Sequence, residues 1–247
     1  FSEDAGGTGA GPVEVSALMG EVGRSLAPEP LLYGALLPGI VIDKVASGDR
    51  RTSLLTEVSE GRLLLGYAHA EPEDRWPAAA VTTTATGASD GVTLDGVKYP
   101  VLAGDVAQKF VVSARRTDGT IGLFLVDADA SGVTVDGFRT YDDRRAARVS
   151  FANAPAIELA EGDQSDAIAY ADIFAQTAQC AEAVGAMEES LRFTTEYLKQ
   201  RKQFGVPLAK FQTLTQRAAD MYVLLEQARS MSLYATVTLA DGDVNPI

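Results

Sequence analysis

The sequence predicts an α+β protein of several domains, with helices at both ends and a β-rich middle. Residues before 61 show the spacing of amphipathic helices, and residues 62–160 hold many short strand patterns separated by turn signals. From about residue 165, an apolar stripe of helical period continues almost to the last residue. The predicted domains are a partial N-terminal helical domain at 1–61, a β-barrel or sandwich at 62–160, and the first two long helices of a bundle at 161–247.

The N-terminal region is predicted to contain a loop and three helices. Residues 1–12 are rich in glycine and predict a loop, whereas Val13–Leu26 carries apolar residues on one helical face. Two further helices are expected at Leu31–Ala46 and Arg51–Glu60, and Gly61 closes the region.

The middle region is predicted to be a set of short strands, which is typical of a sandwich or barrel. The first strand is expected within 62–70. The others are expected at Ala80–Thr86, Val92–Leu94, Lys98–Leu102, Phe110–Arg115, Ile121–Asp127, Val133–Phe138 and Ala147–Phe151. Asp-Gly pairs at 90–91, 95–96 and 118–119 predict tight turns.

The C-terminal region is predicted to form two long packed helices. The first stripe consists of Ile173, Cys180, Val184, Met187, Leu191, Thr194 and Leu198. The second consists of Leu214, Ala218, Met221, Leu225, Ala228, Ser232, Ala235 and Leu239. A hairpin of two helices buries one face of each, so further helices are expected from sequence after Ile247, from another subunit, or from both.

The two helices are joined by a corner at 197–212. Gly205 suits a left-handed turn that ends a helix, and Pro207 prevents the helix from restarting at once. Lys199, Arg201 and Lys202 are expected in the last helical turn, where cations complement the helix dipole.

Composition argues against several classes of function. The net charge of −13 argues against nucleic acid as the main ligand. One cysteine and one histidine argue against a disulfide framework and a zinc site, and they fit a reducing, cytoplasmic compartment. No apolar run is long enough for a membrane span. The chain starts without methionine or a signal peptide, so it is expected to be a fragment of a longer chain. Together with the helices expected after Ile247, this predicts sequence missing at both ends.

The corner carries the most specific motif in the chain. Arg201-Lys-Gln-Phe204-Gly205, followed by Phe211-Gln212 and Ala219-Asp220-Met221, resembles a signature of the acyl-CoA dehydrogenase family. The order of helices, β-region and helices agrees with that family. Two segments are most similar to the small subunit of two-component pimeloyl-CoA dehydrogenase-like enzymes. They are Ala68-His69-Ala70-Glu71-Pro72 and Val111-Val-Ser-Ala-Arg115.

The resemblance implies an FAD site shared between subunits. Arg201 would contact the diphosphate of FAD in a neighbouring subunit, Phe204 would pack on the cofactor, and Gln212 would contact its far end. An arginine presents a fork of donors that matches phosphate oxygens. The residues alone leave another interpretation open, in which Arg201 is a solvated cation at a helix end and Phe204 is a packing residue.

The resemblance also places cofactor contacts in the β-region, at Tyr67, His69, Ala70 and Leu102. Ala70 replaces a threonine of the family's Thr-Glu-Pro segment, and 100–102 read Pro-Val-Leu where the family has Trp-Ile-Thr. These changes remove an aromatic ring and hydroxyl donors, so this chain's own flavin pocket is expected to lack some of the family's cofactor contacts. His69 is expected to be structural or to line the cofactor through its backbone rather than to act as a base.

The catalytic base is not visible in the sequence. In most of the family it is a glutamate that would lie beyond Ile247, and the alternative position on the long helix is Ala175 here. Glu182, Glu188 and Glu189 are expected to be solvated, and Cys180 is expected to pack in the core. Asp142 and Asp143 are expected to form a charged turn rather than a metal site.

The resulting expectation is one subunit of an FAD-dependent acyl-CoA dehydrogenase that acts on an acyl-CoA. It would assemble with homologous subunits into a homo- or heterotetramer. In a heteromer it is expected to be the non-catalytic half that completes a partner's FAD site. Two alternatives stay open: an assembly subunit without cofactor, and a flavin-dependent oxidase or monooxygenase on the same fold.

Overall fold

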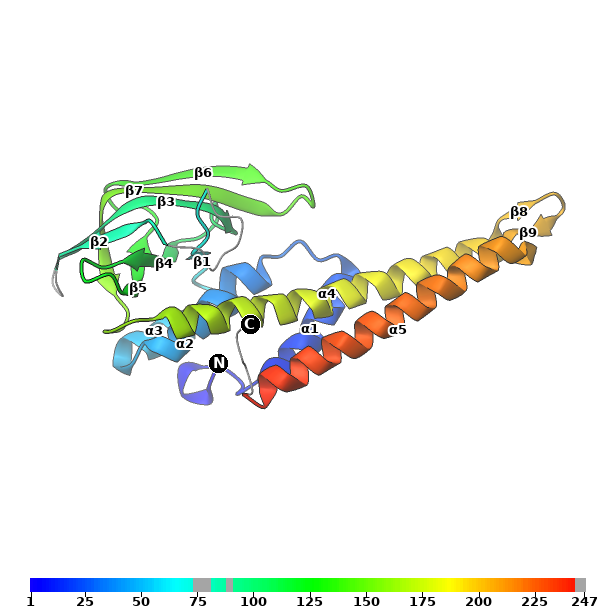
Figure 1. The fold of residues 1–247 in the computed structure, drawn as a ribbon, viewed down its shortest axis with the longest axis horizontal. Coiled ribbons are helices and arrows are strands. Elements are labelled where there is room, and N and C mark those ends of the chain that lie inside the picture. The colour runs from blue at the N-terminus through cyan, green and yellow to red at the C-terminus, as the bar shows by residue number, and fades with distance from the viewer. Residues whose placement is uncertain (73–80, 88–90, 243–247) are drawn as a thin grey trace. The chain divides into compact units, whose positions relative to one another are not determined.

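The computed structural model describes residues 1–72, 81–87 and 91–242, which form two compact units (Figure 1). The barrel unit combines Phe1–Ala10 with Pro28–Asp172. The helix unit combines Gly11–Ala27 with the chain from Ile173 onward. Helix α1 therefore belongs with the C-terminal helices, although it is separated from them by the whole β-region.

The helices of the barrel unit follow the predicted positions. A single 3-10 turn, η1 (Glu3–Ala5), interrupts the expected N-terminal loop. The predicted helix at 31–46 is a π-helical stretch, η2 (Leu32–Leu36), that runs directly into α2 (Leu37–Val45). Pro38 lies in the first turn of α2, where a missing backbone N–H costs little. The third helix is α3 (Gly48–Ser59).

The β-region closes into a barrel. Its strands are β1 (Leu65–Ala68), β2 (Thr84–Thr86), β3 (Val92–Leu102), β4 (Lys109–Arg115), β5 (Ile121–Asp127), β6 (Val133–Arg139) and β7 (Arg145–Glu158). The ring runs β4–β2–β3–β7–β5 and returns to β4, while β1 pairs in parallel with β4 and β6 pairs with β7. Phe110 and Phe124 fill the interior at 0% and 1% exposure, so the barrel core is closely packed.

One predicted turn is wrong. Asp95-Gly96 does not reverse the chain, because β3 continues through it and pairs with β7 on both sides. The pair forms a bulge in which Gly96 has φ +151°, and a Cβ there would lie 2.6 Å from Thr83 Oγ1. Glycine is thus required for a close strand approach rather than for a hairpin.

The other predicted turns and strand lengths differ less from the structure. Asp118-Gly119 forms the expected turn, with Gly119 at φ +91°. The turn predicted at 90–91 includes Asp90, which lies outside the described residues. Strand β7 extends well past the predicted Ala147–Phe151 because it pairs with β3, β5 and β6 in turn.

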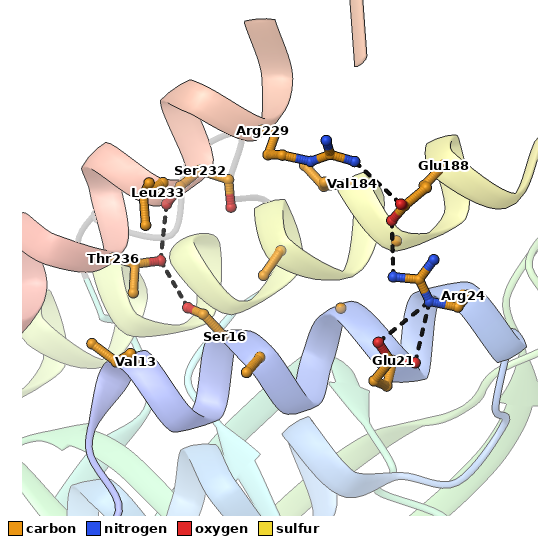
Figure 2. A pocket seen from close by; sticks show the side chains of 14 residues that line it. Val13, Ser16, Glu21, Arg24, Val184, Glu188, Arg229, Ser232, Leu233 and Thr236 are labelled. Carbon is orange, nitrogen blue, oxygen red and sulfur yellow. Dashed lines mark hydrogen bonds and ion pairs between the residues drawn. The ribbon is translucent and has the colours of Figure 1, made fainter. Parts of the chain in front are cut away.

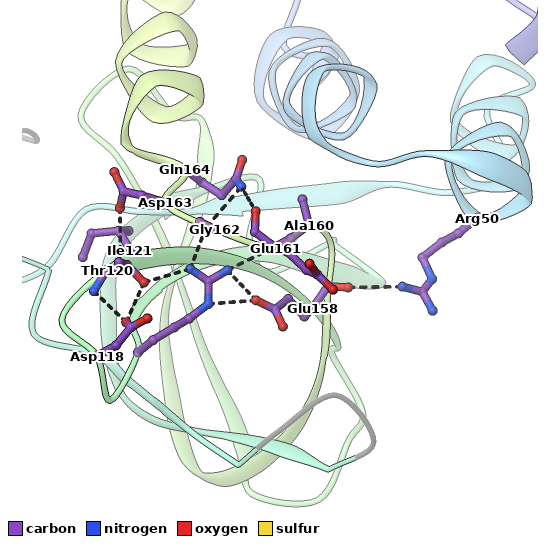
Figure 3. A network of polar contacts seen from close by, with 11 residues as sticks. Arg50, Asp118, Thr120, Ile121, Glu158, Ala160, Glu161, Gly162, Asp163 and Gln164 are labelled. Atoms are coloured by element: carbon purple, nitrogen blue, oxygen red, sulfur yellow. Dashed lines mark hydrogen bonds and ion pairs between the residues drawn. The ribbon is translucent and has the colours of Figure 1, made fainter.

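Arg116 holds the connection between β7 and α4 (Ser165–Gln200) against the barrel (Figure 3). Its guanidinium donates to Glu158 at 2.8 Å, to the Ala160 oxygen at 3.0 Å and to the Gly162 oxygen at 2.7 Å. The guanidinium also donates to Thr120 at 3.2 Å and a second time to Glu158, so all five of its N–H groups have an acceptor. These bonds anchor the connection at 158–162 that leads into α4.

The helix unit contains α1 (Pro12–Ser25), α4 beyond Asp172, and α5 (Gln212–Ala240). The corner between the long helices holds a two-stranded hairpin, β8 (Lys202–Gln203) and β9 (Val206–Pro207), and a 3-10 turn, η3 (Leu208–Lys210). Gly205 is left-handed as predicted, at φ +81°. Only Lys199 lies in the last helical turn, because the chain leaves the helix before Arg201 to form the hairpin.

The predicted stripes are confirmed with one exception. All eight stripe residues of α5 are buried or half-buried. On α4, Cys180 is exposed, and its predicted place in the core is wrong because the neighbouring Ala178 and Ala181 take the buried positions. Elsewhere α5 exposes large apolar side chains, among them Leu224, Met231, Leu233 and Tyr234. Further cover for this surface remains a prediction.

Helices α1 and α4 cross in backbone contact at glycines. A Cβ on Gly23 would lie 1.8 Å from the Glu182 oxygen, and a Cβ on Gly185 would lie 1.9 Å from the Gly20 oxygen. By contrast, a Cβ on Gly20 would have its nearest neighbour, the Ala181 oxygen, at 3.9 Å. The crossing therefore depends on two specific glycines. None of the helices in the described ranges has both the length and the apolar composition to cross a bilayer.

Alanine at these glycines should separate the two roles of glycine in a helix. Gly185→Ala and Gly23→Ala should each destabilise the protein by about 1–3 kcal/mol, because the new methyl forces the helices apart. Gly20→Ala is the matched control, and it should be neutral or stabilising by up to about 1 kcal/mol through helix propensity. Urea unfolding of the three variants measures this. Equal destabilisation at all three sites would contradict the crossing geometry.

Candidate functional site

A buried ion pair lies beside the segment that follows β1. Lys98 on β3 is 0% exposed, and its ammonium nitrogen lies 2.7 Å from Glu71 Oε1. The Glu71 side chain is 3% exposed. Lys98 also donates to the His69 backbone oxygen at 3.0 Å and to Ser113 Oγ at 3.1 Å. Three acceptors thus match the three protons of the ammonium group.

Glu71 is satisfied from the opposite side by β2 and the residues that precede it. Its Oε1 accepts from the Thr83 backbone at 2.9 Å and the Thr83 hydroxyl at 2.7 Å. Its Oε2 accepts from the Thr82 backbone at 2.8 Å and from the Thr82 hydroxyl. Burial raises the pKa of Glu71, but the bonds from Lys98, Thr82 and Thr83 outweigh it and lower the pKa to about 2. Glu71 is therefore ionised and acts as a structural anchor rather than an acid or base.

The anchor fixes the predicted cofactor residues His69 and Ala70. The His69 ring has its Nδ1 atom 2.8 Å from Ser113 Oγ, and its backbone oxygen is held by Lys98. The Ala70 oxygen accepts from the Tyr99 backbone at 2.8 Å. The Tyr67 ring stacks on His69 with centroids 5.9 Å apart. The structure thus brings Tyr67, His69 and Ala70 together, and His69, 6% exposed, is structural in this arrangement.

Leu102, the fourth predicted contact in the β-region, lies four residues beyond Lys98 on the same strand. It is half-buried and pairs with Ala146 of β7. The next residue, Ala103, is 2% exposed and has φ +58°, which is an unusual conformation for a residue with a side chain. Backbone of this kind persists only where the surrounding structure holds it.

Asp172 was not identified from the sequence. It lies on α4 within the barrel unit, and within the described residues its carboxyl makes no hydrogen bond or ion pair. Burial raises its pKa to about 6. The only signal in the sequence was an acidic residue in an otherwise small and apolar stretch, Tyr170-Ala-Asp172-Ile-Phe174.

The three predicted residues of the corner lie in the helix unit, and all three are exposed. Within the described residues, the Arg201 side chain makes no hydrogen bond or ion pair. Phe204 is 92% exposed and left-handed at φ +53°, with its ring edge-on to Phe211 at 6.2 Å. Gln212 begins α5. An exposed arginine without a polar partner among the described residues and an exposed aromatic in a left-handed conformation therefore lie three residues apart in this hairpin.

Of the glutamates predicted to be solvated, Glu188 is not free in solution. It is half-buried and accepts from Arg24 of α1 at 2.8 Å and from Arg229 of α5 at 3.3 Å (Figure 2). These pairs lie at one end of a groove of about 420 Å³ between α1, α4 and α5. Glu189 pairs with Arg192 on the surface. Glu188 therefore links three helices.

Both aspartates of the turn at 142–143 form ion pairs with arginines. Asp142 pairs with Arg144 at 2.9 Å and Asp143 with Arg139 at 2.9 Å. Among the residues that the structure describes, no three His, Cys, Asp or Glu side chains gather in a way that could hold a metal ion.

Removing one partner of the buried pair should be far more costly than removing one partner of an exposed pair. Lys98→Met leaves the Glu71 charge buried and uncompensated, so it should destabilise the protein by about 3–5 kcal/mol. Lys109→Met is the control, because Lys109 pairs with Asp127 at the surface, and it should cost about 1 kcal/mol or less. Chemical unfolding compares the two. Similar losses would show that the Lys98 pair is not structural.

The same pair predicts a pH dependence of stability. The pKa of Glu71 is lowered in the folded state from 4.5 to about 2, so its contribution is present above pH 4.5 and is lost as pH falls toward about 2. Glu71→Gln should remove this part of the acid-induced loss. Urea unfolding across that pH range tests it, and an unchanged slope in the variant would contradict the assignment.

Two family models match the chain. "Acyl-CoA dehydrogenase, middle domain" matches residues 66–154, and "Acyl-CoA dehydrogenase, C-terminal domain" matches residues 174–247. Acyl-CoA dehydrogenase FadE27 of Mycobacterium tuberculosis is 27% identical over 98% of this chain and 63% of its own length. FadE28 of the same organism is 32% identical over 90% of this chain and 62% of its own length. The chain therefore spans less than two thirds of these relatives.

Solved structures give the same result. The Tcur3481-Tcur3483 steroid ACAD is 33% identical with a TM-score of 0.86, covering 98% of this chain and 65% of that one. The ChsE4-ChsE5 complex of Mycobacterium tuberculosis is 25% identical with a TM-score of 0.85, covering 99% and 65%. A glutaryl-CoA dehydrogenase from Mycobacterium smegmatis in complex with FADH2 has the same fold, with a TM-score of 0.89 at 21% identity, covering 98% and 64%. Matching models over both the barrel and the long helices, and relatives aligned over nearly the whole chain, show that the chain belongs to the acyl-CoA dehydrogenase family.

Proposed function

We propose that this chain is a subunit of an FAD-dependent acyl-CoA dehydrogenase that introduces an α,β double bond into an acyl-CoA thioester. The observation that carries the proposal is the corner at 201–212, where an unpaired arginine and an exposed, strained phenylalanine stand together. Within the described residues the Arg201 side chain makes no hydrogen bond or ion pair, and the Phe204 ring is 92% exposed although its edge meets Phe211. A flavin dinucleotide offers phosphates for the first and a flat ring system for the second.

The residues present fit such a cofactor in the barrel unit as well. Hydrogen bonds fix His69 and Ala70 in the wall formed by Tyr67, His69 and Ala70, and the buried Tyr67 hydroxyl has no hydrogen-bond partner among the described residues. When bound, FAD would accept the hydride that leaves the β-carbon of the substrate. The residues of this chain would supply binding and orientation: Arg201 a charge for the diphosphate, Phe204 a packing surface, and Gln212 an amide.

We further propose that the enzyme is heteromeric and that this chain completes the FAD site of a homologous partner. One line of support is the similarity to the ChsE4-ChsE5 complex. The other is that the corner keeps the family's Arg-x-x-Phe-Gly motif, whereas the barrel segments at 70 and 100–102 depart from the family's pattern. The alternative base position holds Ala175, and the α4 glutamates Glu188 and Glu189 are engaged in ion pairs. The base is therefore expected from the partner or from sequence after Ile247.

The acyl group is proposed from two sources of support. Segments 68–72 and 111–115 resemble enzymes of pimeloyl-CoA, whereas a relative of 33% identity is a steroid ACAD. A match over 98% of the chain outweighs two segments of five residues, so it favours a steroid side-chain thioester. Turnover of a steroid side-chain CoA thioester and of pimeloyl-CoA by the purified complex distinguishes the two, and faster turnover of pimeloyl-CoA would reverse the preference.

Variants at the corner test the shared site. Arg201→Ala should reduce FAD retention at least tenfold, since a charge-assisted bond to phosphate is lost. Phe204→Gly should also reduce retention, yet leave the free protein equally or more stable, because glycine tolerates the positive φ. Lys199→Ala on the last turn of α4 is the matched control and should change little. The measurement is the amount of FAD that stays bound after gel filtration. If Arg201→Ala retained all of its FAD, Arg201 would be a solvated surface cation rather than a cofactor contact.

Two other functions have distinct outcomes. A colourless purified complex would favour an assembly subunit without cofactor. Oxygen consumption without an added electron acceptor would favour a flavin-dependent oxidase or monooxygenase on the same fold.

A further inference from the structure

A cleft of about 440 Å³ lies at the end of the β6–β7 hairpin in the barrel unit (Figure 1). Its walls come from the turn after β3 and from the two strands of the hairpin. Three of the residues that line it are charged, and two of these charges are positive. The lining residues are Asp105, Val135, Gly137, Phe138, Arg139 and Arg145.

The turn after β3 holds Arg145 at two points. The Ala103 backbone N–H donates to the Arg145 carbonyl oxygen at 2.8 Å. The Asp105 carboxylate pairs with the Arg145 guanidinium at 2.5 Å. Gly137 makes room for this pair, because a Cβ there would lie 2.9 Å from the Asp105 Cβ. Both the backbone and the side chain of Arg145 are therefore held in place.

This arrangement has two energetic costs. Ala103 has φ +58°, which strains a residue that carries a side chain. The Oδ1 atom of Asp105 is buried and has no hydrogen-bond partner among the described residues, and a buried acceptor without a donor destabilises the fold. Strain and unsatisfied groups of this kind gather where the structure serves binding rather than stability. Orientation of Arg145 therefore explains Asp105 better than stabilisation does.

Arg139 stands directly opposite Arg145 in the register of β6 and β7. Side chains at such positions lie on the same face with Cβ atoms about 5 Å apart, and like charges there repel each other. Arg139 pairs with Asp143, whose side chain is 82% exposed, so this pair neutralises Arg139 only weakly. Most N–H groups of the two guanidinium groups have no acceptor among the described residues.

We propose that this cleft binds an organic anion, a carboxylate or a phosphate ester carried on an apolar body. The anion accepts hydrogen bonds from Arg139 and Arg145, whose forks of donors match carboxylate and phosphate oxygens, and it relieves their mutual repulsion. Val135 and Phe138 give the cleft an apolar side for the rest of the ligand. The proposal goes beyond the function proposed above and does not rest on it.

The first test compares charged and neutral probes. Benzoate and phenyl phosphate are titrated into the full chain with its co-purifying partner and excess FAD, and benzamide is the neutral control for benzoate. Ligand-observed NMR measures each dissociation constant. Benzoate should bind at least about tenfold more tightly than benzamide, because only the anion gains from the two guanidinium groups. The tighter of the two anions decides between a carboxylate and a phosphate ester, and no binding of either would overturn the proposal.

The second test uses variants of the hairpin. Arg139→Gln and Arg145→Gln should each weaken binding of the preferred anion about tenfold, which corresponds to about 1.4 kcal/mol. Arg148→Gln is the matched control, because Arg148 lies three residues further along β7 and therefore on its other face; it should leave the affinity unchanged. Arg145→Gln deprives Asp105 of its partner and costs stability. Arg139→Gln leaves that pair intact, so it decides the result if Arg145→Gln does not fold.

The variants also separate a small ligand from other occupants of the cleft. Equal weakening by all three variants would mean that the anions respond only to the general charge of the hairpin, and the site would be overturned. Loss of the partner from Arg139→Gln on gel filtration would mean that an acidic side chain of the partner fills the cleft. Loss of FAD from the same variant would mean that the cleft contacts the cofactor. Either loss would overturn the proposal, whereas weaker anion binding with partner and FAD retained supports it.

Discussion

The ion pair between Lys98 and Glu71 is the interaction on which the barrel side of the candidate site depends. It is shielded from solvent on both sides, and it ties the segment after β1 to β3, β4 and the residues that lead into β2. Burying two charges is expensive, and the expense is tolerated here because every polar atom of the pair has a partner. The result is that the wall formed by Tyr67, His69 and Ala70 is held in place by the buried pair.

The wall and the corner differ in how their side chains are held. The wall is preorganised: His69 and Ala70 are fixed by hydrogen bonds before any ligand arrives, so little conformational freedom remains to be lost on binding. The corner instead displays groups outward. Phe204 is held in a conformation that costs energy and exposes its ring, which makes sense if the ring is buried in an assembly. The shared FAD site proposed above would use both kinds of surface.

Much of the architecture could be predicted from the sequence because it follows from local periodicity. The stripe on α5, the left-handed Gly205 and the Asp118-Gly119 turn each depend on residues close in sequence. The bulge at Asp95-Gly96 could not be predicted, because the same dipeptide serves a hairpin or a close strand approach, and Thr83 decides between them. Cys180 was misplaced because small neighbours fill the α4 interface better than the period alone indicates. Lys98, Glu71 and Asp172 were missed for a related reason: their importance comes from burial and from partners far away in sequence.

We propose that this chain contributes half of a flavin site that is complete only in an assembly. The most direct measurement is the FAD content per protein chain, determined from the visible spectrum after purification of the chain alone and after co-purification with its partner. We expect little bound FAD in the chain alone and stoichiometric FAD in the assembly. Stoichiometric FAD in the isolated chain, together with acyl-CoA oxidation, would contradict the claim.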